Sequence, residues 1–495
     1  MNFFYLLRLN NIVPSTLPQK DFVVEGLAYD SRKVKNNYIF FAIKGYKDDG
    51  NKYVQDAISN GAKVIITDNK SADKLHELLP NVQIIGSRDV RKSIALMSNI
   101  YYGCPSEKLN LIGVTGTNGK TTITYLLKAI FEESGFKCGL IGTIDYMTGE
   151  KTEVSRLTTP DSLEINQILS RMVESKINFC FMEVSSIALV LNRVYGQNFK
   201  SGIFTNLTSE HLDLHENMKN YFNAKKILFD NLKKSDIAVS NKDDEYGEFI
   251  LKDTKAKKIF YSIDSESDFK AVKEKISIDG IEFVLNIKGK EYKIKSNLTG
   301  RFNIYNILAA ISAALKYEIK IETIISALSK FMPVNGRFNK IKLPNDAHAV
   351  IDYSHTSDSL KNAIEAALEI NKTQNNKGRI ITIFGCGGNK DKTKRPVMGD
   401  IATSLSDYSI VTSDNPRFED PMDIINEVVK GIKTKGNFQI EDNRDEAIKK
   451  GIEMSKANDI ILICGKGHET YQEINGVKTH FDDKEMVQKY FHLAK

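Results

Sequence analysis

The stretch LIGVTGTNGKTT at residues 111–122 decides the fold of the largest part of this chain. An apolar strand pattern leads into a loop with two glycines, and a helical pattern follows, which is the order of a phosphate-binding cradle. There, backbone N–H groups and the helix N-terminus bind phosphate oxygens, the lysine reaches the terminal phosphates, and a hydroxyl binds Mg²⁺. The spacing differs from G-x-x-x-x-G-K-[ST], because Val114 occupies the first glycine position. A chance glycine turn is the alternative; we predict phosphate binding at Gly116, Thr117, Asn118, Gly119, Lys120, Thr121 and Thr122.

Length and composition indicate a folded protein of several domains. The 495 residues predict about three domains, and 41% hydrophobic with 27% charged residues excludes disorder as the main state. Lys and Arg number 69 and Asp and Glu 63, a net charge of +6 that is not gathered into basic blocks. We therefore expect no nucleic-acid partner, whereas anionic small substrates stay open.

Cysteine usage and hydropathy predict a cytoplasmic protein. The five cysteines are odd in number and form no C-x-x-C pair, so neither a disulfide framework nor a zinc site is indicated. The N-terminal run MNFFYLLRLNNIV contains Arg8 and lacks a basic leader and a cleavage site, so we interpret it as part of the first domain. No segment has the apolar length needed to cross a bilayer, and we expect no membrane association.

Three blocks follow one another along the chain. Residues 1–88 alternate short apolar runs with helical patterns, which is typical of a small α/β domain. Residues 89–334 contain the glycine loop and, near 251–297, an alternating lysine-rich section that predicts antiparallel hairpins. Residues 335–495 contain four apolar runs separated by helical patterns, the signature of a parallel doubly wound sheet.

The four runs of the last block each end in polar or glycine-rich residues. These ends read DYSHT, GCGGNKDKTKRP, SDNPR and GKGHE. Ligands of open α/β sheets bind at the carboxyl ends of the strands, so we expect the four loops to converge on one crevice.

Several residues of the central block could hold a cation. Glu183 ends the apolar strand NFCFME and is either a metal ligand or an ordinary strand-end carboxylate. His211 and Asp213 follow the next apolar run and face the same region. The helical pattern at 218–232 places Lys225 on the apolar stripe. The pattern alone favours an ammonium that snorkels or pairs with Asp213 over a lysine that CO₂ has converted into an anionic carbamate.

The ordered motifs resemble those of the ATP-dependent Mur ligases of peptidoglycan synthesis, and within them the ligases that add the third residue of the peptide. The resemblance covers nearly the whole chain. Its motifs are DSR, GTNGKTT, LTTPD, MEVSS, TNLTSEHLDLH, AKK, GRFN (twice), DYSHTSDSL, KRPVMG, SDNPR and GKGHE. Chance is a poor explanation for so many motifs in this order.

The resemblance implies an α/β fold with three domains. Residues 1–88 would bind the UDP end of the substrate, residues 89–334 would be a P-loop ATPase with a parallel sheet, and residues 335–495 would be a Rossmann-like domain that binds an amino acid. The implied activity is that of a monomeric, cytoplasmic, ADP-forming amide ligase that acts on UDP-MurNAc-L-Ala-D-Glu in cell-wall precursor synthesis.

The resemblance also implies roles for individual residues. The uridine nucleotide would contact Ser31 and the region of Gly45, the muramoyl dipeptide Thr158, Thr159, Ser185 and Arg193, and ATP Asn306, Arg337 and Asp352. Against the preference from the residues alone, Lys225 would be carbamylated. The catalytic residues besides Lys120 would then be Glu183, His211 and Lys225, which share two Mg²⁺ ions with Thr121 and the phosphates.

The last block would recognise the incoming amino acid. An arginine offers a bidentate fork to a carboxylate that lysine as a substrate lacks, so Arg417 favours meso-diaminopimelate. Ligases of this kind that use lysine, ornithine or lanthionine keep the related diamino acids open as alternatives. The implied pocket consists of Arg395, Asp414, Asn415, Pro416, Arg417, Gly465 and Glu469.

Four residues of this chain differ from the family pattern, and other functions compete with the one that the motifs imply. The departures are Ile187 for a His, Leu191 and Asn192 for a Gln-His pair, and Ser357 for a Pro, and they put individual substrate contacts in doubt. Folylpolyglutamate synthetase is the nearest rival enzyme, and the first domain and DNPR argue against it. A P-loop switch protein would need a guanine-reading N-K-x-D segment, whose letters occur at 241–244. A non-catalytic Mur-like scaffold is disfavoured, because every expected charged motif position is present.

Overall fold

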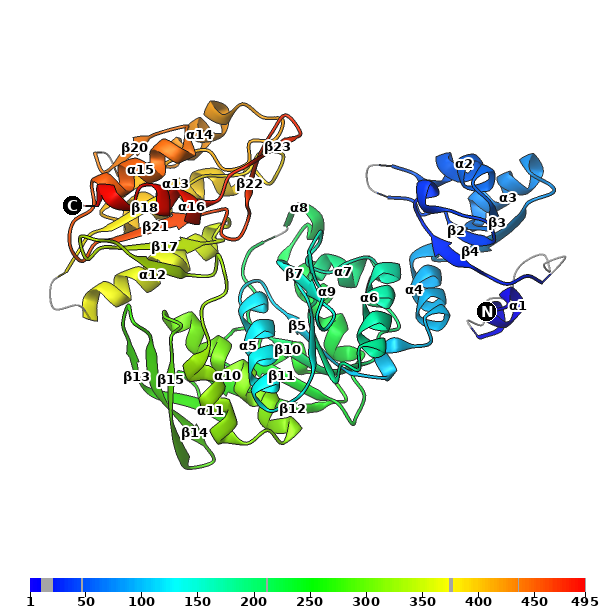
Figure 1. Ribbon diagram of the computed structural model, residues 1–495, viewed down its shortest axis with the longest axis horizontal. Coiled ribbons are helices and arrows are strands. Elements are labelled where there is room, and N and C mark those ends of the chain that lie inside the picture. Colours follow the sequence, from blue (N-terminus) through cyan, green and yellow to red (C-terminus); the bar gives the residue numbers. More distant parts are fainter. Residues whose placement is uncertain (10–20, 46–47, 211, 374–376, 435, 495) are drawn as a thin grey trace. The chain divides into compact units, whose positions relative to one another are not determined.

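The computed structural model describes residues 1–9, 21–45, 48–210, 212–373, 377–434 and 436–494. These residues form two compact units (Figure 1). The first unit consists of Met1–Thr115, Phe136–Gly202 and Ala224–Asp236. The second consists of Gly116–Gly135, Ile203–Asn223 and Ile237–Lys495.

The first unit begins with a parallel sheet of strand order β1-β2-β3-β4. Its side chains alternate between two apolar clusters, one around Ile39 and Ile66 and the other around Phe40 and Ile65. The small α/β pattern predicted for this part of the sequence is therefore present. The elements are α1 (Phe3–Leu9), β1 (Gly26–Ala28), β2 (Tyr38–Phe41), α2 (Val54–Ser59), β3 (Ala62–Asp68), α3 (Asn69–Leu78), β4 (Gln83–Ser87) and α4 (Val90–Tyr101).

The rest of the first unit is built around strand β9 (Phe179–Glu183), which pairs in parallel with β5 on one side and β6 on the other. All residues of β9 are buried, which explains the apolar run that precedes Glu183. The strand order here is β10-β5-β9-β6-β7-β8. The remaining elements are β5 (Asn110–Thr115), β6 (Cys138–Ile141), β7 (Asp145–Met147), β8 (Thr152–Val154), α6 (Ser162–Glu174), α7 (Ser186–Val190) and β10 (Phe199–Phe204).

The second unit contains the helix that follows the glycine loop and the predicted hairpins. Strand β14 pairs antiparallel with both β13 and β15, as the alternating lysine-rich section predicted. Helix α10 is buried along most of its length and contacts α5 and β12. Helix α9 (Met218–Asp230) begins in this unit, and its residues from Ala224 onward belong to the first unit. The other elements are α5 (Lys120–Glu133), α8 (Leu212–His215), β11 (Ile237–Asn241), β12 (Lys257–Ser262), β13 (Phe269–Ile276), β14 (Ile281–Ile287), β15 (Lys290–Ser296), α10 (Arg301–Ala314) and α11 (Ile321–Lys330).

The C-terminal part of the second unit is the predicted doubly wound sheet. Its strand order is β16-β17-β21-β18-β19-β20, and all neighbours pair in parallel except β16 with β17. The elements are β16 (Asn339–Lys342), β17 (His348–Asp352), α12 (Ser357–Thr373), β18 (Ile380–Phe384), α13 (Lys394–Leu405), β19 (Tyr408–Val411), α14 (Pro421–Val429), β20 (Phe438–Ile440), α15 (Arg444–Glu453), β21 (Ile460–Cys464), β22 (Tyr471–Ile474), β23 (Val477–His480) and α16 (Asp483–Lys489).

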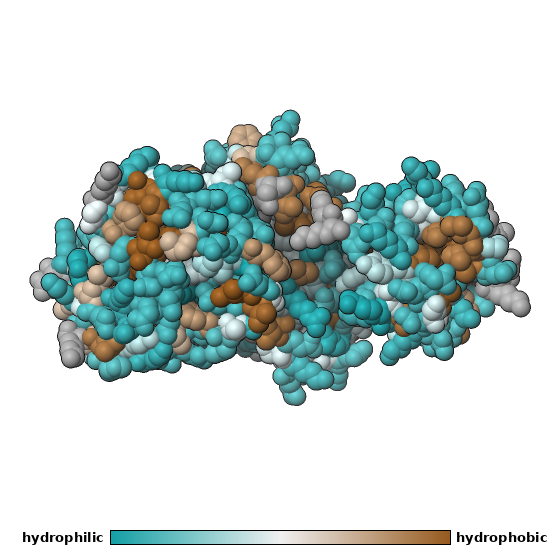
Figure 2. All heavy atoms as spheres, turned by 90° about the horizontal axis from the view of Figure 1, so that it is seen from above, coloured by the Kyte–Doolittle hydropathy of each residue, from teal (hydrophilic) through white to brown (hydrophobic). Residues whose placement is uncertain are grey.

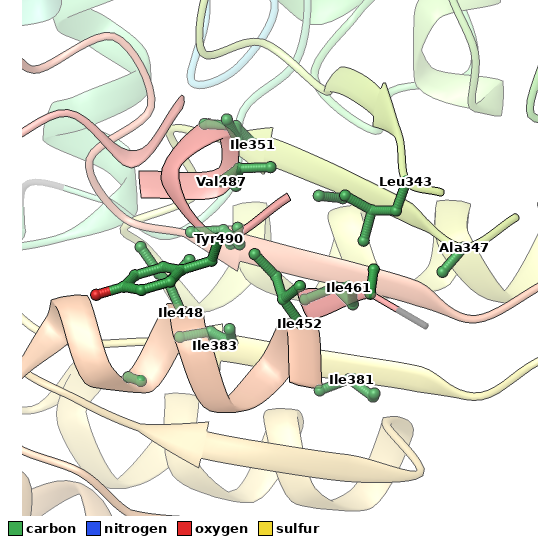
Figure 3. Packing of buried hydrophobic residues seen from close by; sticks show 14 of the residues in the cluster. Leu343, Ala347, Ile351, Ile381, Ile383, Ile448, Ile452, Ile461, Val487 and Tyr490 are labelled. Atoms are coloured by element: carbon green, nitrogen blue, oxygen red, sulfur yellow. The ribbon is translucent and has the colours of Figure 1, made fainter. Parts of the chain in front are cut away.

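An aliphatic core fixes one face of this sheet. Figure 3 shows Ile383 and Ile461 of the strands packed against Ile448 and Ile452 of α15, with Val487 of α16 beside them. Because side chains alternate along a strand, the residues between these isoleucines point to the opposite face. The carboxyl ends of the strands stay outside the core and carry the loops.

One buried ion pair joins the last two long helices of this sheet. Arg444 of α15 and Asp483 of α16 are both fully buried, with Nε–Oδ1 and Nη2–Oδ2 distances of 2.8 and 2.7 Å. Nη2 of Arg444 also donates to the carbonyl of Cys464, at 3.1 Å. The pair therefore ties both helices to the end of β21.

Replacing Asp483 with asparagine should lower the free energy of unfolding by about 3–5 kcal/mol, because a buried guanidinium loses its countercharge. Urea unfolding followed by far-UV circular dichroism measures this change. Asp346→Asn is the matched control, since Asp346 pairs with Lys342 on the surface, where the side chains are 68% and 66% exposed, and should change stability by less than about 1 kcal/mol. Equal effects of the two substitutions would contradict the prediction.

Neither the described helices nor the surface face shown in Figure 2 is strongly apolar. None of the helices within the described ranges combines the length and the apolarity that crossing a bilayer requires. The face shown in Figure 2 is mostly hydrophilic, and its hydrophobic patches are small and separated.

Candidate active site

The glycine loop of the second unit has a backbone that only glycine permits at two positions. Gly119 has φ 89°, and a Cβ atom there would lie 2.4 Å from Oδ1 of Asn306. A Cβ atom at Gly116 would lie 1.8 Å from Oγ1 of Thr205. Both contacts exclude a larger residue, so the loop backbone is closely packed, and its binding of phosphate stays a prediction.

Lys120 begins helix α5 directly after this loop. Its Nζ donates to the carbonyls of Gly116 and Thr117, at 2.8 and 2.7 Å, and so holds the loop closed around the helix N-terminus. The oriented N–H groups of a helix N-terminus, together with an ammonium, attract anions. The arrangement therefore suits the phosphates of a nucleotide.

The segment after β10 fixes the loop from one side. Oγ1 of Thr205 donates to the carbonyl of Asn118 at 2.6 Å, and the N–H of Thr208 donates to Oγ1 of Thr117 at 3.0 Å. The segment thus positions the loop by hydrogen bonds from both side chain and backbone. His211, predicted to bind a metal in the same segment, lies outside the described residues.

The three residues predicted to hold ATP lie in the second unit with the loop. Asn306 contacts Gly119 as described, and Nη2 of Arg337 donates to Oγ1 of Thr121 at 3.0 Å. Asp352, at the end of β17, accepts a hydrogen bond from the N–H of Phe338 at 2.7 Å, and burial raises its pKa. Asp352 thereby holds the residue next to Arg337.

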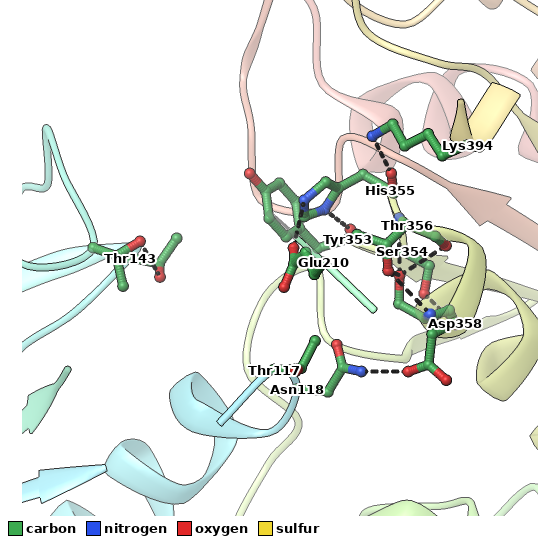
Figure 4. Close-up of polar contacts among 12 residues, drawn as sticks. Thr117, Asn118, Thr143, Glu210, Tyr353, Ser354, His355, Thr356, Asp358 and Lys394 are labelled. Carbon is green, nitrogen blue, oxygen red and sulfur yellow. Dashed lines mark hydrogen bonds and ion pairs between the residues drawn. The ribbon is translucent and has the colours of Figure 1, made fainter. Parts of the chain in front are cut away.

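The first helix of the C-terminal sheet contacts the glycine loop directly (Figure 4). Oδ2 of Asp358, near the start of α12, accepts from Nδ2 of Asn118 at 2.8 Å and from Oγ1 of Thr208 at 2.9 Å. His355 lies 3.7 Å from Glu210, and burial and the Lys394 ammonium lower the histidine pKa to about 4. His355 is therefore neutral at physiological pH and can donate or accept without carrying charge.

The first unit places Glu183 at the carboxyl end of β9. Its side chain is only 1% exposed. Oε1 accepts from the N–H of Thr143 at 2.8 Å, and Oε2 accepts from the Thr143 hydroxyl at 3.0 Å. This bidentate contact orients a buried carboxylate at the strand end, where α/β sheets bind their ligands.

Four residues predicted to bind the muramoyl dipeptide lie beside Glu183. Oγ1 of Thr159 donates to the Glu183 carbonyl at 2.8 Å and accepts from the N–H of Ser185 at 3.0 Å. Nη1 of Arg193 donates to the Thr159 carbonyl at 2.9 Å, and Thr143 donates to Thr158 at 3.1 Å. The structure therefore gathers all four into one cluster.

Ser31, predicted to contact the uridine nucleotide, lies in a short 3-10 helix of the same unit. Asp30 caps this helix by accepting from the N–H of Arg32, and the Ser31 carbonyl accepts from Nδ2 of Asn60 at 3.0 Å. Gly45 lies near Asp48, whose carbonyl accepts its N–H at 2.8 Å. Ser31 lies in the connection after β1, and Gly45 lies in the connection after β2.

Lys225 lies on the buried face of α9, as the helical pattern predicted. Its side chain is 1% exposed, whereas the next residue, Lys226, is half-buried and pairs with Asp230 at 2.5 Å. The contrast between the two lysines follows from their positions on the helix.

The four loops of the C-terminal sheet converge as expected. Asn415 donates through Nδ2 to Oε2 of Glu469 at 2.8 Å, and Nη1 of Arg417 donates to the carbonyl of Gly388 at 2.9 Å. The rings of Tyr353 and His468 are 4.8 Å apart between centroids. Residues from DYSHT, GCGGNKDKTKRP, SDNPR and GKGHE thus contact one another.

The SDNPR loop has a strained backbone at its arginine. Arg417 has φ 55°, in the left-handed region that residues with a Cβ rarely adopt. Such strain persists when surrounding contacts determine it, and it concentrates at functional sites. Here the Arg417 N–H and carbonyl both bond to the β22–β23 hairpin, at Glu473 and Asn475.

Arg395 is held by carboxylates of the protein itself. Its side chain is fully buried, and Nη1 contacts Glu419 at 2.9 Å and Glu427 at 2.8 Å. The hydrogen bond from Arg395 lowers the pKa of Glu419 to about 2. A direct contact between Arg395 and the incoming amino acid stays a prediction.

Two site residues were missed by sequence reasoning. Thr143 follows strand β6, and Asp358 lies in the first turn of α12. The sequence offered one signal for a functional role, because each residue follows the end of a parallel strand. A threonine or an aspartate at such a place does not by itself reveal which residue it contacts. Both become visible only through contacts with Glu183 and Asn118.

The chemistry of the predicted donors fits Mg²⁺ and ATP. A threonine hydroxyl and a buried carboxylate are the oxygen donors that Mg²⁺ prefers, and the glycine cradle admits only backbone at the phosphates. Within the described residues, no cluster of three or more His, Cys, Asp or Glu could hold a metal by itself. The predicted metal ligands, which include a threonine, a modified lysine and the undescribed His211, do not depend on such a cluster.

The glycine loop, the lysine after it and the parallel sheets define a P-loop nucleotide-binding α/β enzyme. Three sequence models match the chain: the Mur ligase family catalytic domain at residues 23–101, the Mur ligase middle domain at 114–314, and the Mur ligase glutamate ligase domain at 336–467. The chain belongs to the Mur ligase family, which confirms the resemblance seen in the motifs.

Named relatives cover nearly the whole chain. UDP-N-acetylmuramoyl-L-alanyl-D-glutamate--2,6-diaminopimelate ligase 1 of Clostridium acetobutylicum is 46% identical over 94% of both chains. A solved structure of a UDP-N-acetylmuramoyl-L-alanyl-D-glutamate--2,6-diaminopimelate ligase is 30% identical, with a TM-score of 0.68 over 98% of both chains. The MurF ligase of Thermotoga maritima in complex with ADP shares the fold, with 17% identity and a TM-score of 0.64 over 95% of this chain and 98% of that one.

Proposed function

We propose that this protein is an ATP-dependent ligase that joins meso-diaminopimelate to the D-Glu residue of UDP-MurNAc-L-Ala-D-Glu and releases ADP and phosphate. The observation that carries the proposal is the 46% identity, over 94% of the chain, to a ligase named for these substrates. The phosphate loop and the converging C-terminal loops supply the two sites that such a reaction needs.

The first step is the transfer of the γ-phosphoryl group to the side-chain carboxylate of D-Glu. A carboxylate oxygen bonds to the γ-phosphorus, the bond to the β–γ bridging oxygen breaks, and ADP leaves. Lys120 stabilises the negative charge on the phosphoryl oxygens, and the helix N-terminus behind it adds its dipole. Bound Mg²⁺ supplies further charge neutralisation; Thr121, Glu183, His211 and carbamylated Lys225 would hold it.

The second step forms the amide. The amine of diaminopimelate attacks the acyl-phosphate carbonyl, the bond to phosphate breaks, and the nitrogen loses a proton as inorganic phosphate leaves. The C-terminal loops orient the amine and keep out water that would hydrolyse the acyl phosphate. Gly336 and its neighbours are the candidate hinge for this closure.

The residues of the first unit would hold the nucleotide substrate. Ser31 and the Gly45 region contact the uridine nucleotide in this proposal, and the cluster of Thr158, Thr159, Ser185 and Arg193 contacts the dipeptide. Their mutual hydrogen bonds orient hydroxyl and guanidinium donors beside the buried carboxylate of Glu183. Asn192, one of the departures from the family pattern, instead donates to Asp89 at 3.2 Å.

The three-domain division is part of the same proposal. Residues 1–88 would serve the UDP end, residues 89–334 ATP, and residues 335–495 the amino acid. The protein would act as a monomer in the cytoplasm on small-molecule substrates.

The P-loop switch is disfavoured by the surroundings of its guanine-reading candidate. The aspartate that would read the base is Asp244, and both of its carboxylate oxygens accept backbone N–H groups, Oδ2 from Leu207 at 3.0 Å and Oδ1 from Tyr246 at 2.9 Å. Burial raises the pKa of Asp244 to about 6. The carboxylate therefore ties its own turn to the segment after β10, a role that differs from reading a base.

Phosphate release from ATP tests the proposed function. Purified protein is given UDP-MurNAc-L-Ala-D-Glu with meso-diaminopimelate, L-lysine, L-ornithine or no amino acid. Release with diaminopimelate alone, together with the product mass, is expected. Faster release with lysine or ornithine would overturn the amino-acid assignment, and release that ignores both substrates would overturn the ligase.

Replacing Arg417 with alanine should raise the KM for diaminopimelate about 10- to 100-fold, because the distal carboxylate loses a charge-assisted, bidentate partner. The KM for ATP should not change. Steady-state phosphate release measures both constants. An unchanged KM for diaminopimelate would show that Arg417 supports only the loop.

A further inference from the structure

A lysine that the proposed reaction does not use is fully buried at the end of β21. Lys466 follows Gly465 in the GKGHE loop, and its side chain is 0% exposed. Burial lowers its pKa. Removing an ammonium from water is unfavourable unless it is paired and hydrogen-bonded, so its contacts indicate what it does.

The Nζ atom of Lys466 donates to Oδ1 of Asn415 at 3.1 Å and lies 3.9 Å from Oε2 of Glu469. The rings of Tyr471 and Phe481 surround the ammonium at 5.7 and 6.0 Å from their centroids. Two rings at this distance favour a cation over a neutral group. The Asn415 oxygen and the two rings therefore offset part of the cost of burying the ammonium.

Lys466 determines which way the Asn415 amide points. An ammonium only donates, and the N–H of Glu473 also donates to Asn415 Oδ1, at 2.9 Å, so that atom must be the oxygen. The NH₂ end of the amide then faces Glu469 and donates to Oε2 at 2.8 Å. A directed chain of hydrogen bonds thus runs from Lys466 through Asn415 to Glu469.

The same lysine opposes the negative charges around Glu469. Burial and the neighbouring Asp414 carboxylate raise the pKa of Glu469, whereas Lys466 and Arg417 lower it. Burial and the Glu469 carboxylate in turn raise the pKa of Tyr353. With Lys466 in place, Glu469 keeps a cationic neighbour and a fixed hydrogen-bond donor.

We propose that Lys466 is a positioning residue of the amino-acid site: through Asn415 it holds the Glu469 carboxylate in the orientation that accepts the ammonium group of the incoming amino acid. The inference rests on the proposed function, because it gives Glu469 an amino-acid ligand. The ligand class is a zwitterionic diamino acid, whose ammonium needs an ionised acceptor. Lys466 itself does not contact the substrate.

The test is a KM-against-kcat comparison of Lys466→Met with the unmodified protein. Methionine keeps an unbranched apolar stem that is one atom shorter, and it removes the charge and the hydrogen-bond donor. The KM for diaminopimelate should rise about 10- to 100-fold, while kcat at saturating diaminopimelate and the KM values for ATP and the nucleotide dipeptide change less than about threefold. Lys340→Met is the control, since Lys340 is half-buried on β16, donates to the Ile278 carbonyl and should leave every constant unchanged.

The pH profile adds a readout that a purely structural role would not move. Without the positive charge of the lysine, the Glu469 carboxylate becomes protonated at a higher pH. On acidification, the KM for diaminopimelate of Lys466→Met should therefore begin to rise at a higher pH than that of the unmodified protein. The inference would be overturned if the KM for diaminopimelate were unchanged, or if the pH at which this KM begins to rise were the same in Lys466→Met and in the unmodified protein. Lys466→Arg, which keeps charge and donors, should stay closer to the unmodified protein than Lys466→Met.

Folding is checked by thermal unfolding of each variant. If Lys466→Met does not fold, Lys466→Gln replaces it, because glutamine still offers an N–H donor to Asn415 and tests the charge alone. Failure of both variants to fold would assign the lysine to stability and overturn the inference. The unmodified protein distinguishes the failure of one proposal from the failure of the other. If it shows no turnover that depends on diaminopimelate, the proposed function fails. If it does, and Lys466→Met behaves in the same way, only the positioning role of Lys466 is rejected.

Discussion

Replacing Lys120 with methionine should lower kcat for phosphate release by on the order of 10³-fold, or about 4 kcal/mol of transition-state stabilisation. The ammonium begins helix α5 and lies against the loop carbonyls of Gly116 and Thr117. No other cation in that loop can replace it, because the loop otherwise consists of glycine, threonine and asparagine. Steady-state phosphate release with ATP, the nucleotide dipeptide and diaminopimelate all at saturating concentration measures this kcat.

Lys128→Met is the control for this variant. Lys128 lies on the same helix and pairs with Glu132 at 2.7 Å near the surface. Its loss should leave kcat within about twofold and stability within about 1 kcal/mol. A Lys120→Met protein that retained a tenth of the activity would show that phosphoryl transfer depends on other groups.

The second large effect is expected at Lys225. Methionine at this position should lower kcat at least 100-fold, because the proposed carbamate provides an anionic oxygen ligand that a thioether cannot replace. Folding stability should stay the same or increase, since a buried polar group gives way to an apolar one of similar volume. Activity and urea unfolding together distinguish lost chemistry from lost structure.

The neighbouring Lys226 is the matched control on the same helix. Lys226→Met removes the ion pair that this half-buried lysine makes with the exposed Asp230, and it should leave kcat unchanged. Depleting CO₂ from the buffer should inactivate the unmodified protein reversibly, with bicarbonate restoring activity, and native mass spectrometry should detect one bound CO₂. A Lys225→Met variant within threefold of normal kcat would reject carbamylation as a catalytic requirement.

Local patterns of the sequence predicted the elements that hold the site. The strand, loop and helix around Lys120 follow from an apolar run, two glycines and a helical pattern, all within a dozen residues. The burial of Lys225 follows from the i, i+4 spacing of its helix, and the hairpins near 269–296 follow from period-two alternation. These predictions succeeded because each depends on neighbours in sequence.

Long-range pairing could not be predicted in the same way. Arg395 reads as a cation directed at a substrate, and only the folded chain reveals that Glu419 and Glu427 surround it. Lys466 lies between two glycines, and its local sequence reveals neither that the side chain is fully buried nor that Asn415, 51 residues earlier, is its acceptor. Sequence spacing carries no information on which of many carboxylates and amides meets a given cation.

The separation between the aliphatic core and the loops of the C-terminal sheet has an evolutionary consequence. The core in Figure 3 is formed by side chains of strands and helices, whereas the polar loops begin after the strands end. Exchanging a loop side chain there removes little buried apolar area, so it weakens folding less than a core substitution does. Amino-acid preference can therefore diverge among descendants of this chain by loop changes alone, while the scaffold that carries the loops is inherited intact.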